Sequence, residues 1–141
     1  MKTAKIILVD DHQIFRQGIK NLIRFENIGT VIAEASDGVE FIQLLSDHDP
    51  DLVLMDIDMP GLNGIDTTRK ALKIKPDLRI LAVTMFAKED YLYQMIEAGA
   101  IGFILKSAGI YELEKAIHLG LKGEKYFSFN SSGKTLNNFG R

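Results

Sequence analysis

Short apolar runs alternate with stretches of helical periodicity along most of this sequence. Each run is too short to be a helix, is rich in residues that favour strands, and ends in a polar or turn residue. The runs are Lys5–Val9, Thr30–Glu34, Asp51–Met55, Arg79–Val83 and Ile101–Leu105. This strict alternation predicts a parallel sheet with helices on both faces.

The stretches between the runs place their apolar residues at the spacing of one helix face. Asp37 and Glu40 form a capping pair that predicts the start of the second helix. The third helix is expected over residues 64–73, and Gly99 and Gly123 are expected to end the fourth and fifth. The apolar positions of the other helices are Phe15, Ile19, Leu22 and Ile23; Phe41, Leu44 and Leu45; Leu92, Met95 and Ile96; and Leu113, Ala116, Ile117 and Leu121.

Five strand–helix units fit a doubly wound α/β fold of the flavodoxin-like kind, with strand order 2-1-3-4-5. A closed eight-stranded barrel would need about twice the length. The chain has no cysteine, which excludes disulfides and thiol catalysis. Its longest uncharged apolar run, Ala98–Leu105, has eight residues, whereas a membrane span needs about 20. With a formal net charge of −2, the sequence predicts a soluble, cytoplasmic domain without a basic nucleic-acid surface.

Ligands of open α/β sheets bind at the carboxyl ends of the strands, so the residues there are the first candidates for a site. The central predicted strands end in Asp10-Asp11, Asp56, Thr84 and Lys106. Taken singly, the acids could be helix caps or turn residues, Thr84 an ordinary strand residue and Lys106 a solvated terminus.

Together these residues indicate a site for a phosphoryl group. Three crowded carboxylates favour protonation or a bound cation, and hard oxygen ligands suit Mg²⁺. Lys106 would add a positive charge for the phosphate, and Thr84 a hydroxyl donor.

Four segments, ILVDDH, LVLMDIDMPGLNG, ILAVT and GFILK, resemble the receiver domain of two-component response regulators. The resemblance covers about residues 4–123. It implies that Asp56 is the phosphoacceptor. It also implies Mg²⁺ binding by Asp10, Asp11 and Asp56, together with the backbone carbonyl of Asp58.

The same resemblance implies how the domain would switch. Asp56 would take a phosphoryl group from a phosphohistidine of a sensor histidine kinase, with Lys106 stabilising its charge. Thr84 would then bond the phosphoryl group, and Phe103 would turn inward, so that phosphorylation biases a two-state equilibrium. Phe stands at this switch position where Tyr is frequent, and Met85 follows Thr84 where a small residue is usual. On this reading the chain is a signalling switch, not an enzyme.

Within the family, DDHQIFRQGI and GFILKS resemble the LuxR-type branch of transcription regulators. We therefore predict a receiver domain over residues 1–123 and a linker over residues 124–141, toward a C-terminal DNA-binding domain that this chain does not contain. The chain would be an excised receiver or, less favoured, a stand-alone one. DNA would be contacted only through the absent domain. A homodimer is expected through the face of the fourth helix, fifth strand and fifth helix, or through another helical face.

Two rival readings remain open. Asp56-x-Asp58 resembles the nucleophile pair of haloacid-dehalogenase-type phosphatases, but that pair normally follows the first strand, and the rival gives Asp10 and Asp11 no role. The other rival is a receiver-like interaction module that is never phosphorylated. His12, His48 and His118 lack metal-ligand spacing, so all are predicted to be surface or capping residues. The SSGKT segment at 131–135 lacks the first glycine of a phosphate-binding loop.

Overall fold

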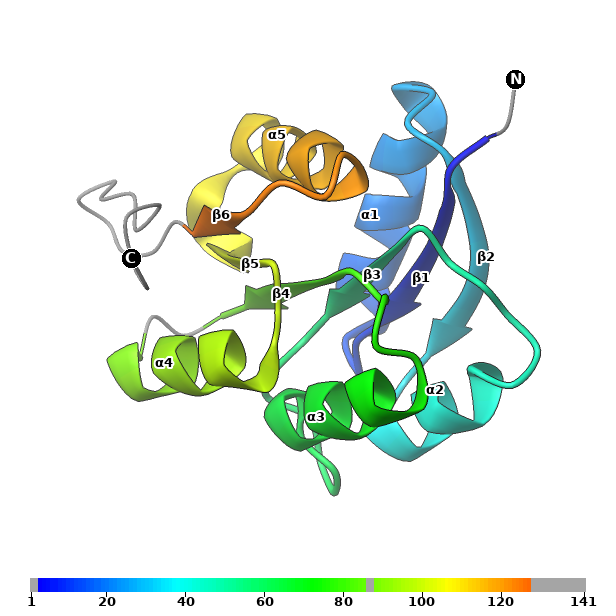
Figure 1. Cartoon of the computed structure of the whole chain (residues 1–141). Helices are drawn as coiled ribbons and strands as arrows, with labels where there is room; N and C mark the ends of the chain where they lie inside the picture. The colour runs from blue at the N-terminus through cyan, green and yellow to red at the C-terminus, as the bar shows by residue number, and fades with distance from the viewer. Residues whose placement is uncertain (1–2, 86–87, 128–141) are drawn as a thin grey trace.

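One parallel sheet forms the centre of the protein, with strand order β2-β1-β3-β4-β5-β6 (Figure 1). The computed structural model describes residues 3–85 and 88–127. The strands are β1 (Lys5–Val9), β2 (Thr30–Ala35), β3 (Leu52–Met55), β4 (Ile80–Thr84), β5 (Gly102–Leu105) and β6 (Tyr126–Phe127). The helices are α1 (Gln13–Phe25), α2 (Gly38–Leu44), α3 (Gly64–Ile74), α4 (Glu89–Ala98) and α5 (Ile110–Leu121), with a 3₁₀ turn η1 (Lys106–Ala108) after β5.

The predicted order 2-1-3-4-5 is confirmed, and a sixth strand extends it. Tyr126 pairs with Gly102 and Phe127 with Phe103, and both β6 side chains are buried. The sheet therefore continues past the predicted end of the receiver at residue 123. A strand of two residues is too short to be recognised from its sequence pattern, so the sequence predicts five strands and not six. Of the predicted linker, residues 128–141 lie outside the described residues, as does the SSGKT segment.

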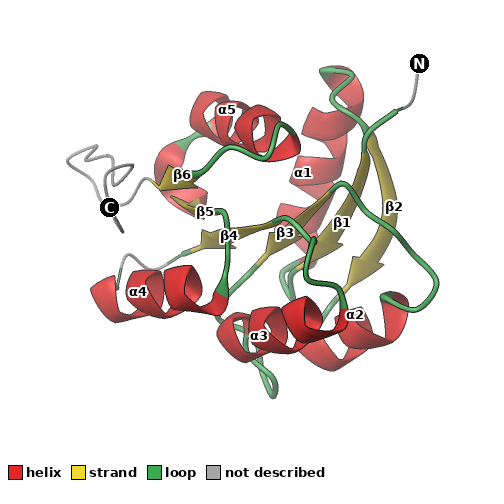
Figure 2. Ribbon diagram, viewed as in Figure 1, coloured by secondary structure: helices red, strands yellow, loops and turns green. Residues whose placement is uncertain are grey.

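Helices cover both faces of the sheet, α1 and α5 on one side and α2, α3 and α4 on the other (Figure 2). The period of two in a strand explains the two cores. In β1, Ile7 and Val9 pack toward α2, α3 and α4, whereas Ile6 and Leu8 pack toward α1 and α5. Burying each such side chain stabilises the fold by about 1.5–3 kcal/mol. Parallel strands covered on both faces read as continuous apolar runs, which is the feature that predicts the fold.

The predicted helix ends are also confirmed. The Asp37 carboxylate accepts a hydrogen bond from the Glu40 N–H (2.8 Å), and the Glu40 carboxylate accepts one from the Ser36 N–H (2.6 Å). Gly99 ends α4 with φ = 107°, in the left-handed region that glycine favours. Within the described residues, the structure has no helix of the length and apolarity that a membrane crossing requires.

Candidate functional site

The carboxyl ends of β1, β3, β4 and β5 bring the predicted site residues to one edge of the sheet. Asp10 and Asp11 follow β1, Asp56 follows β3, and Lys106 follows β5. The Asp56 N–H donates to the Val9 carbonyl (2.9 Å), which ties the ends of β1 and β3 together. The parallel order of the strands thus places residues that are distant in the sequence beside one another.

Lys106 is buried between these carboxylates. Its Nζ lies 2.7 Å from Asp10 Oδ2 and 3.5 Å from Asp56 Oδ2, and its side chain is 4% exposed. The ammonium also lies 4.5 Å from the centre of the Phe15 ring, which adds a cation–π contact. The alternative that Lys106 is a solvated strand terminus is therefore wrong, because the ammonium is held by two acids and an aromatic ring.

Asp56 is an ionisable group whose pKa is shifted by its surroundings. Burial of the side chain, together with the neighbouring charges of Asp10 and Asp11, raises its pKa to about 7. Lys106 and the N–H of Asp58, which donates to Asp56 Oδ1 (3.3 Å), act in the opposite direction. Because these contacts do not offset burial, an ionised Asp56 gains from any added cation.

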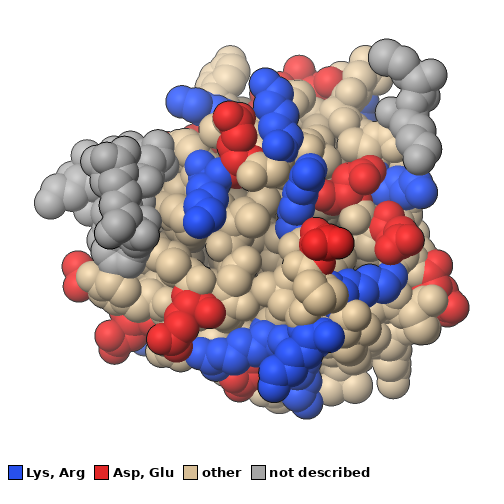
Figure 3. Space-filling view, in the orientation of Figure 1, with Lys and Arg blue, Asp and Glu red and all other residues tan. Residues whose placement is uncertain are grey.

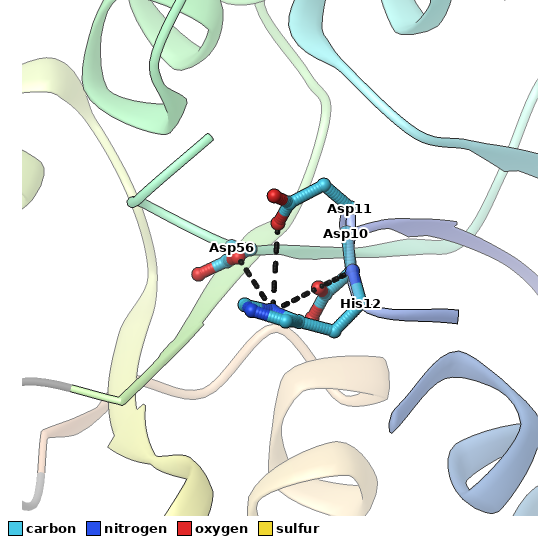
Figure 4. A group of neighbouring side chains, drawn as sticks. All are labelled: Asp10, Asp11, His12 and Asp56. Carbon is cyan, nitrogen blue, oxygen red and sulfur yellow. Dashed lines mark hydrogen bonds and ion pairs between the residues drawn. The ribbon is translucent and has the colours of Figure 1, made fainter. Parts of the chain in front are cut away.

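His12 is exposed, as predicted, but its side chain also belongs to this cluster. It stands at the N-cap of α1, but its side chain makes no capping hydrogen bond. Its Nδ1 lies 3.1 Å from Asp10 Oδ1, 3.4 Å from Asp11 Oδ1 and 3.7 Å from Asp56 Oδ2 (Figure 4). The sequence signal was present, since His12 directly follows the acidic pair.

The other two histidines agree with the prediction. His48 donates from Nδ1 to the carbonyl of Leu44 (2.9 Å), within its own segment. His118 is half-exposed on α5, with Nε2 3.8 Å from a Glu114 oxygen. Neither of these contacts involves the site at the strand ends.

The donor set fits a divalent cation. Ligand atoms of Asp10, Asp11, His12 and Asp56 all lie within 4.8 Å of one another. Asp56 Oδ2 is buried and accepts no hydrogen bond within the described residues, so it has a free acceptor position. Carboxylate oxygens are the ligands that Mg²⁺ prefers, and one or two of them usually suffice. The side chain of Asp58 is not in this group; the ligand expected from Asp58 is its backbone carbonyl.

Thr84 and Phe103 lie on the face of the sheet that α4 covers. Ala82 pairs with Phe103, and Thr84 has the same orientation as Ala82 because strand side chains alternate. Both residues are fully buried, and Thr84 Oγ1 has no hydrogen-bond partner within the described residues. The Phe103 ring already lies inside the core in this structure. Met85, next along the chain, is 57% exposed.

The absence of a side chain at Gly64 lets the start of α3 lie close against the strand end at Asp56. A Cβ at position 64 would lie 2.1 Å from the carbonyl oxygen of Asp56 and 2.7 Å from Ile57 Cα. We expect Gly64→Ala to lower the free energy of unfolding by about 1–3 kcal/mol, the usual cost of overpacking. Gly18→Ala is the matched control, because nothing lies within 4 Å of its Cβ. Helix propensity should make that variant slightly more stable in the same urea titration; equal stability of the two variants would contradict the prediction.

The comparisons with known proteins show the family and the fold of this chain. The family described as response regulator receiver domain matches residues 6–118. The oxygen regulatory protein NreC of Staphylococcus aureus is 38% identical over 136 residues, covering 96% of this chain and 63% of NreC. A LuxR-family response regulator from Aurantimonas sp. SI85-9A1 has a similar structure, with a TM-score of 0.83 and 40% identity over 88% of this chain and 89% of that one.

A further solved structure was determined with a phosphate mimic. The isolated REC domain of RcsB from Salmonella enterica serovar Typhimurium, in the presence of phosphomimetic BeF₃⁻, has a TM-score of 0.82 and 26% identity over 89% of this chain and 94% of that one. The chain spans about three fifths of the length of the curated relatives that it matches. Receiver domains act as signalling switches. By its sequence, fold and strand-end residues, this chain belongs to the receiver domains of two-component response regulators, and its relatives include regulators of the LuxR family.

Proposed function

We propose that this domain accepts a phosphoryl group on Asp56 from a phosphohistidine of a sensor histidine kinase, with Mg²⁺ bound beside it. The observation that carries the proposal is the buried Asp56 carboxylate, whose pKa is raised to about 7 and which lies 3.5 Å from the Lys106 ammonium. A buried carboxylate of this kind is stabilised by cations and hydrogen-bond donors that balance its negative charge. The RcsB domain studied with a phosphate mimic supports the same chemistry in a relative.

The residues of the chain divide the work of the transfer. An Asp56 oxygen would attack phosphorus while the bond from phosphorus to the donor imidazole nitrogen breaks, and Lys106 would balance charge on the transferring oxygens. Thr84 Oγ1, which has no hydrogen-bond partner among the described residues, would donate to a phosphoryl oxygen. Asp10, Asp11, Asp56 and the carbonyl of Asp58 would hold the Mg²⁺, which supplies further neutralisation of charge when bound.

The direct test is the mass of the intact chain after incubation with a small-molecule phosphodonor and Mg²⁺. We expect one phosphoryl group per chain, bound as an acyl phosphate that hydroxylamine removes. Modification without Mg²⁺ at the same rate, or an adduct that resists hydroxylamine, would contradict the proposal.

Metal dependence gives a separate prediction about Asp11. Asp11→Asn should weaken Mg²⁺ binding by about 10-fold or more, because it removes a charged oxygen from the cluster, while its partly exposed position spares the fold. Calorimetric titration with Mg²⁺ measures the change, and Asp37→Ala, which alters a helix cap outside the cluster, is the control. Unchanged Mg²⁺ affinity in Asp11→Asn would count against the ligand set.

An apolar groove between α1 and α5 is our candidate surface for the phosphodonor protein. Ile14 is 90% exposed, Ile110 is exposed as well, and Lys106 lines the same groove as both. A partner that covers Ile14 and Ile110 would thus lie next to a residue of the phosphoacceptor site. Because the groove adjoins the phosphoacceptor site, we propose that the sensor histidine kinase binds there.

Phosphorylation would control an effector through the α4 side of the sheet, where Thr84 and Phe103 lie. We propose that the effector is a DNA-binding domain that regulates transcription, as the LuxR-family relatives suggest. Lys and Arg are mixed with Asp and Glu on the face in Figure 3, which does not favour DNA binding by that face. A homodimer formed through the α4–β5–α5 face, or through another helical face, would be a further way for phosphorylation to control the effector. Both proposed partners place the function in the cytoplasm.

A further inference from the structure

His12 places a nitrogen beside a cluster of side chains whose other candidate metal-ligand atoms are carboxylate oxygens. Its Nδ1 has three carboxylates around it, at 3.1, 3.4 and 3.7 Å, and a ring nitrogen can donate at most one hydrogen bond (Figure 4). A protonated Nδ1 could therefore form a hydrogen bond with only one of these carboxylates, and an unprotonated Nδ1 with none of them.

These separations match the spacing of ligands around one metal ion. With ligands about 2.1 Å from the metal, neighbouring donor atoms are about 3.0 Å apart in an octahedron and about 3.4 Å apart in a tetrahedron. The nitrogen-to-oxygen distances of 3.1 and 3.4 Å fall at these values, and 3.7 Å is slightly wider. All four side chains can therefore contribute ligand atoms to a single ion.

Two further observations point to a cation at Nδ1. The Lys106 ammonium lies 3.0 Å from His12 Nδ1, and because an ammonium can only donate, this contact requires an unprotonated Nδ1 that donates to none of the three carboxylates. Asp56 Oδ2 is buried without a hydrogen-bond partner within the described residues, although it lies in the same cluster. An ion bound between them would use both the lone pair and the free carboxylate position.

We propose that His12 is a metal ligand, and that its imidazole makes this site prefer divalent ions that bind nitrogen ligands well over Mg²⁺. Imidazole suits Co²⁺, Ni²⁺ and Zn²⁺, and affinity for a given site rises from Mn²⁺ toward Cu²⁺, whereas Mg²⁺ favours oxygen ligands. The inference rests on the proposed metal-dependent function, because it assigns a further ligand to the same ion.

The experiment compares Co²⁺ and Mg²⁺ binding by calorimetry on the full chain at one neutral pH. His12→Asn replaces the nitrogen donor with an amide, and the fold should survive because Asn is a favoured N-cap and His12 makes no side-chain cap bond. We expect it to weaken Co²⁺ binding by about 10- to 100-fold and to change Mg²⁺ binding by less than about threefold. His118→Asn, on half-exposed α5 surface, is the matched control and should change neither.

A spectroscopic readout separates ligation from a structural role. With Mn²⁺ bound, electron spin echo measurements should show coupling to an imidazole nitrogen in the natural chain and in His118→Asn, but not in His12→Asn. Absence of nitrogen coupling in the natural chain, or a Co²⁺ preference that persists in His12→Asn, would overturn the proposal. Tighter Mg²⁺ binding by His12→Asn with unchanged Co²⁺ binding would also overturn it, since His12 would then only obstruct the site. If neither ion bound the natural chain, the metal-dependent function itself would fail.

Discussion

Asp56→Asn is expected to abolish phosphoryl acceptance by this domain. The amide keeps the shape of the buried side chain but lacks a nucleophilic oxygen that carries the charge of a carboxylate. The rate of acyl phosphate formation should fall at least about 10³-fold, as when other covalent nucleophiles are removed. Intact mass measurements over time with a small-molecule phosphodonor and Mg²⁺ provide the readout.

Asp58→Asn is the matched control for this change. It makes the same chemical substitution two residues away, where the expected metal ligand is the backbone carbonyl and not the side chain. We expect Asp58→Asn to remain phosphorylated at one site. Full phosphorylation of Asp56→Asn with equal sensitivity to hydroxylamine would show that another residue is the acceptor.

The second large effect concerns the pH dependence of stability without metal. Asp56 has its pKa raised from 3.8 to about 7 in the folded protein, first by burial and then by the charge of Asp10. Between these two values the folded state holds a proton that the unfolded state has lost. Stability therefore falls as pH rises through this window, by an amount on the order of a few kcal/mol.

Asp56→Asn should remove this loss, because the amide stays neutral at every pH. In chelator-containing buffer, urea unfolding at about pH 8 should show the variant more stable than the natural chain by a few kcal/mol, with the difference shrinking toward about pH 4. Asp58→Asn, on a partly exposed residue, should not reproduce the effect. A difference between Asp56→Asn and the natural chain that stays constant across this pH range would refute the assignment to Asp56.

The elements of the fold were predictable because the signals that define them are local. The continuous apolar run of β1 and the helical period of α1 are set by neighbouring side chains, and the cap at Asp37 depends on residues within one turn. Once the strand order follows from the alternation, Asp10, Asp56 and Lys106 must meet at one edge of the sheet. Most of the site could thus be placed before any coordinates were known.

Burial and side-chain direction required the tertiary structure. Lys106 could be read as solvated until Asp10 and the Phe15 ring were placed around it. Strand β6 forms because the Ile101 carbonyl, just before β5, accepts a hydrogen bond from the Tyr126 N–H, and nothing local to Tyr126 encodes such a partner.

The sequence by itself determined the alternating elements, their order and the acids, hydroxyl and lysine at the strand ends, because periodicity and strand-end chemistry are properties of neighbouring residues. Only the tertiary structure decided that His12 faces three carboxylates and that Asp56 is deeply buried. The physical reason is that the third carboxylate beside His12 comes from another strand, and that the groups around Asp56 come from the ends of β1 and β5. The electrostatics of the site therefore depend on contacts between residues far apart in the chain.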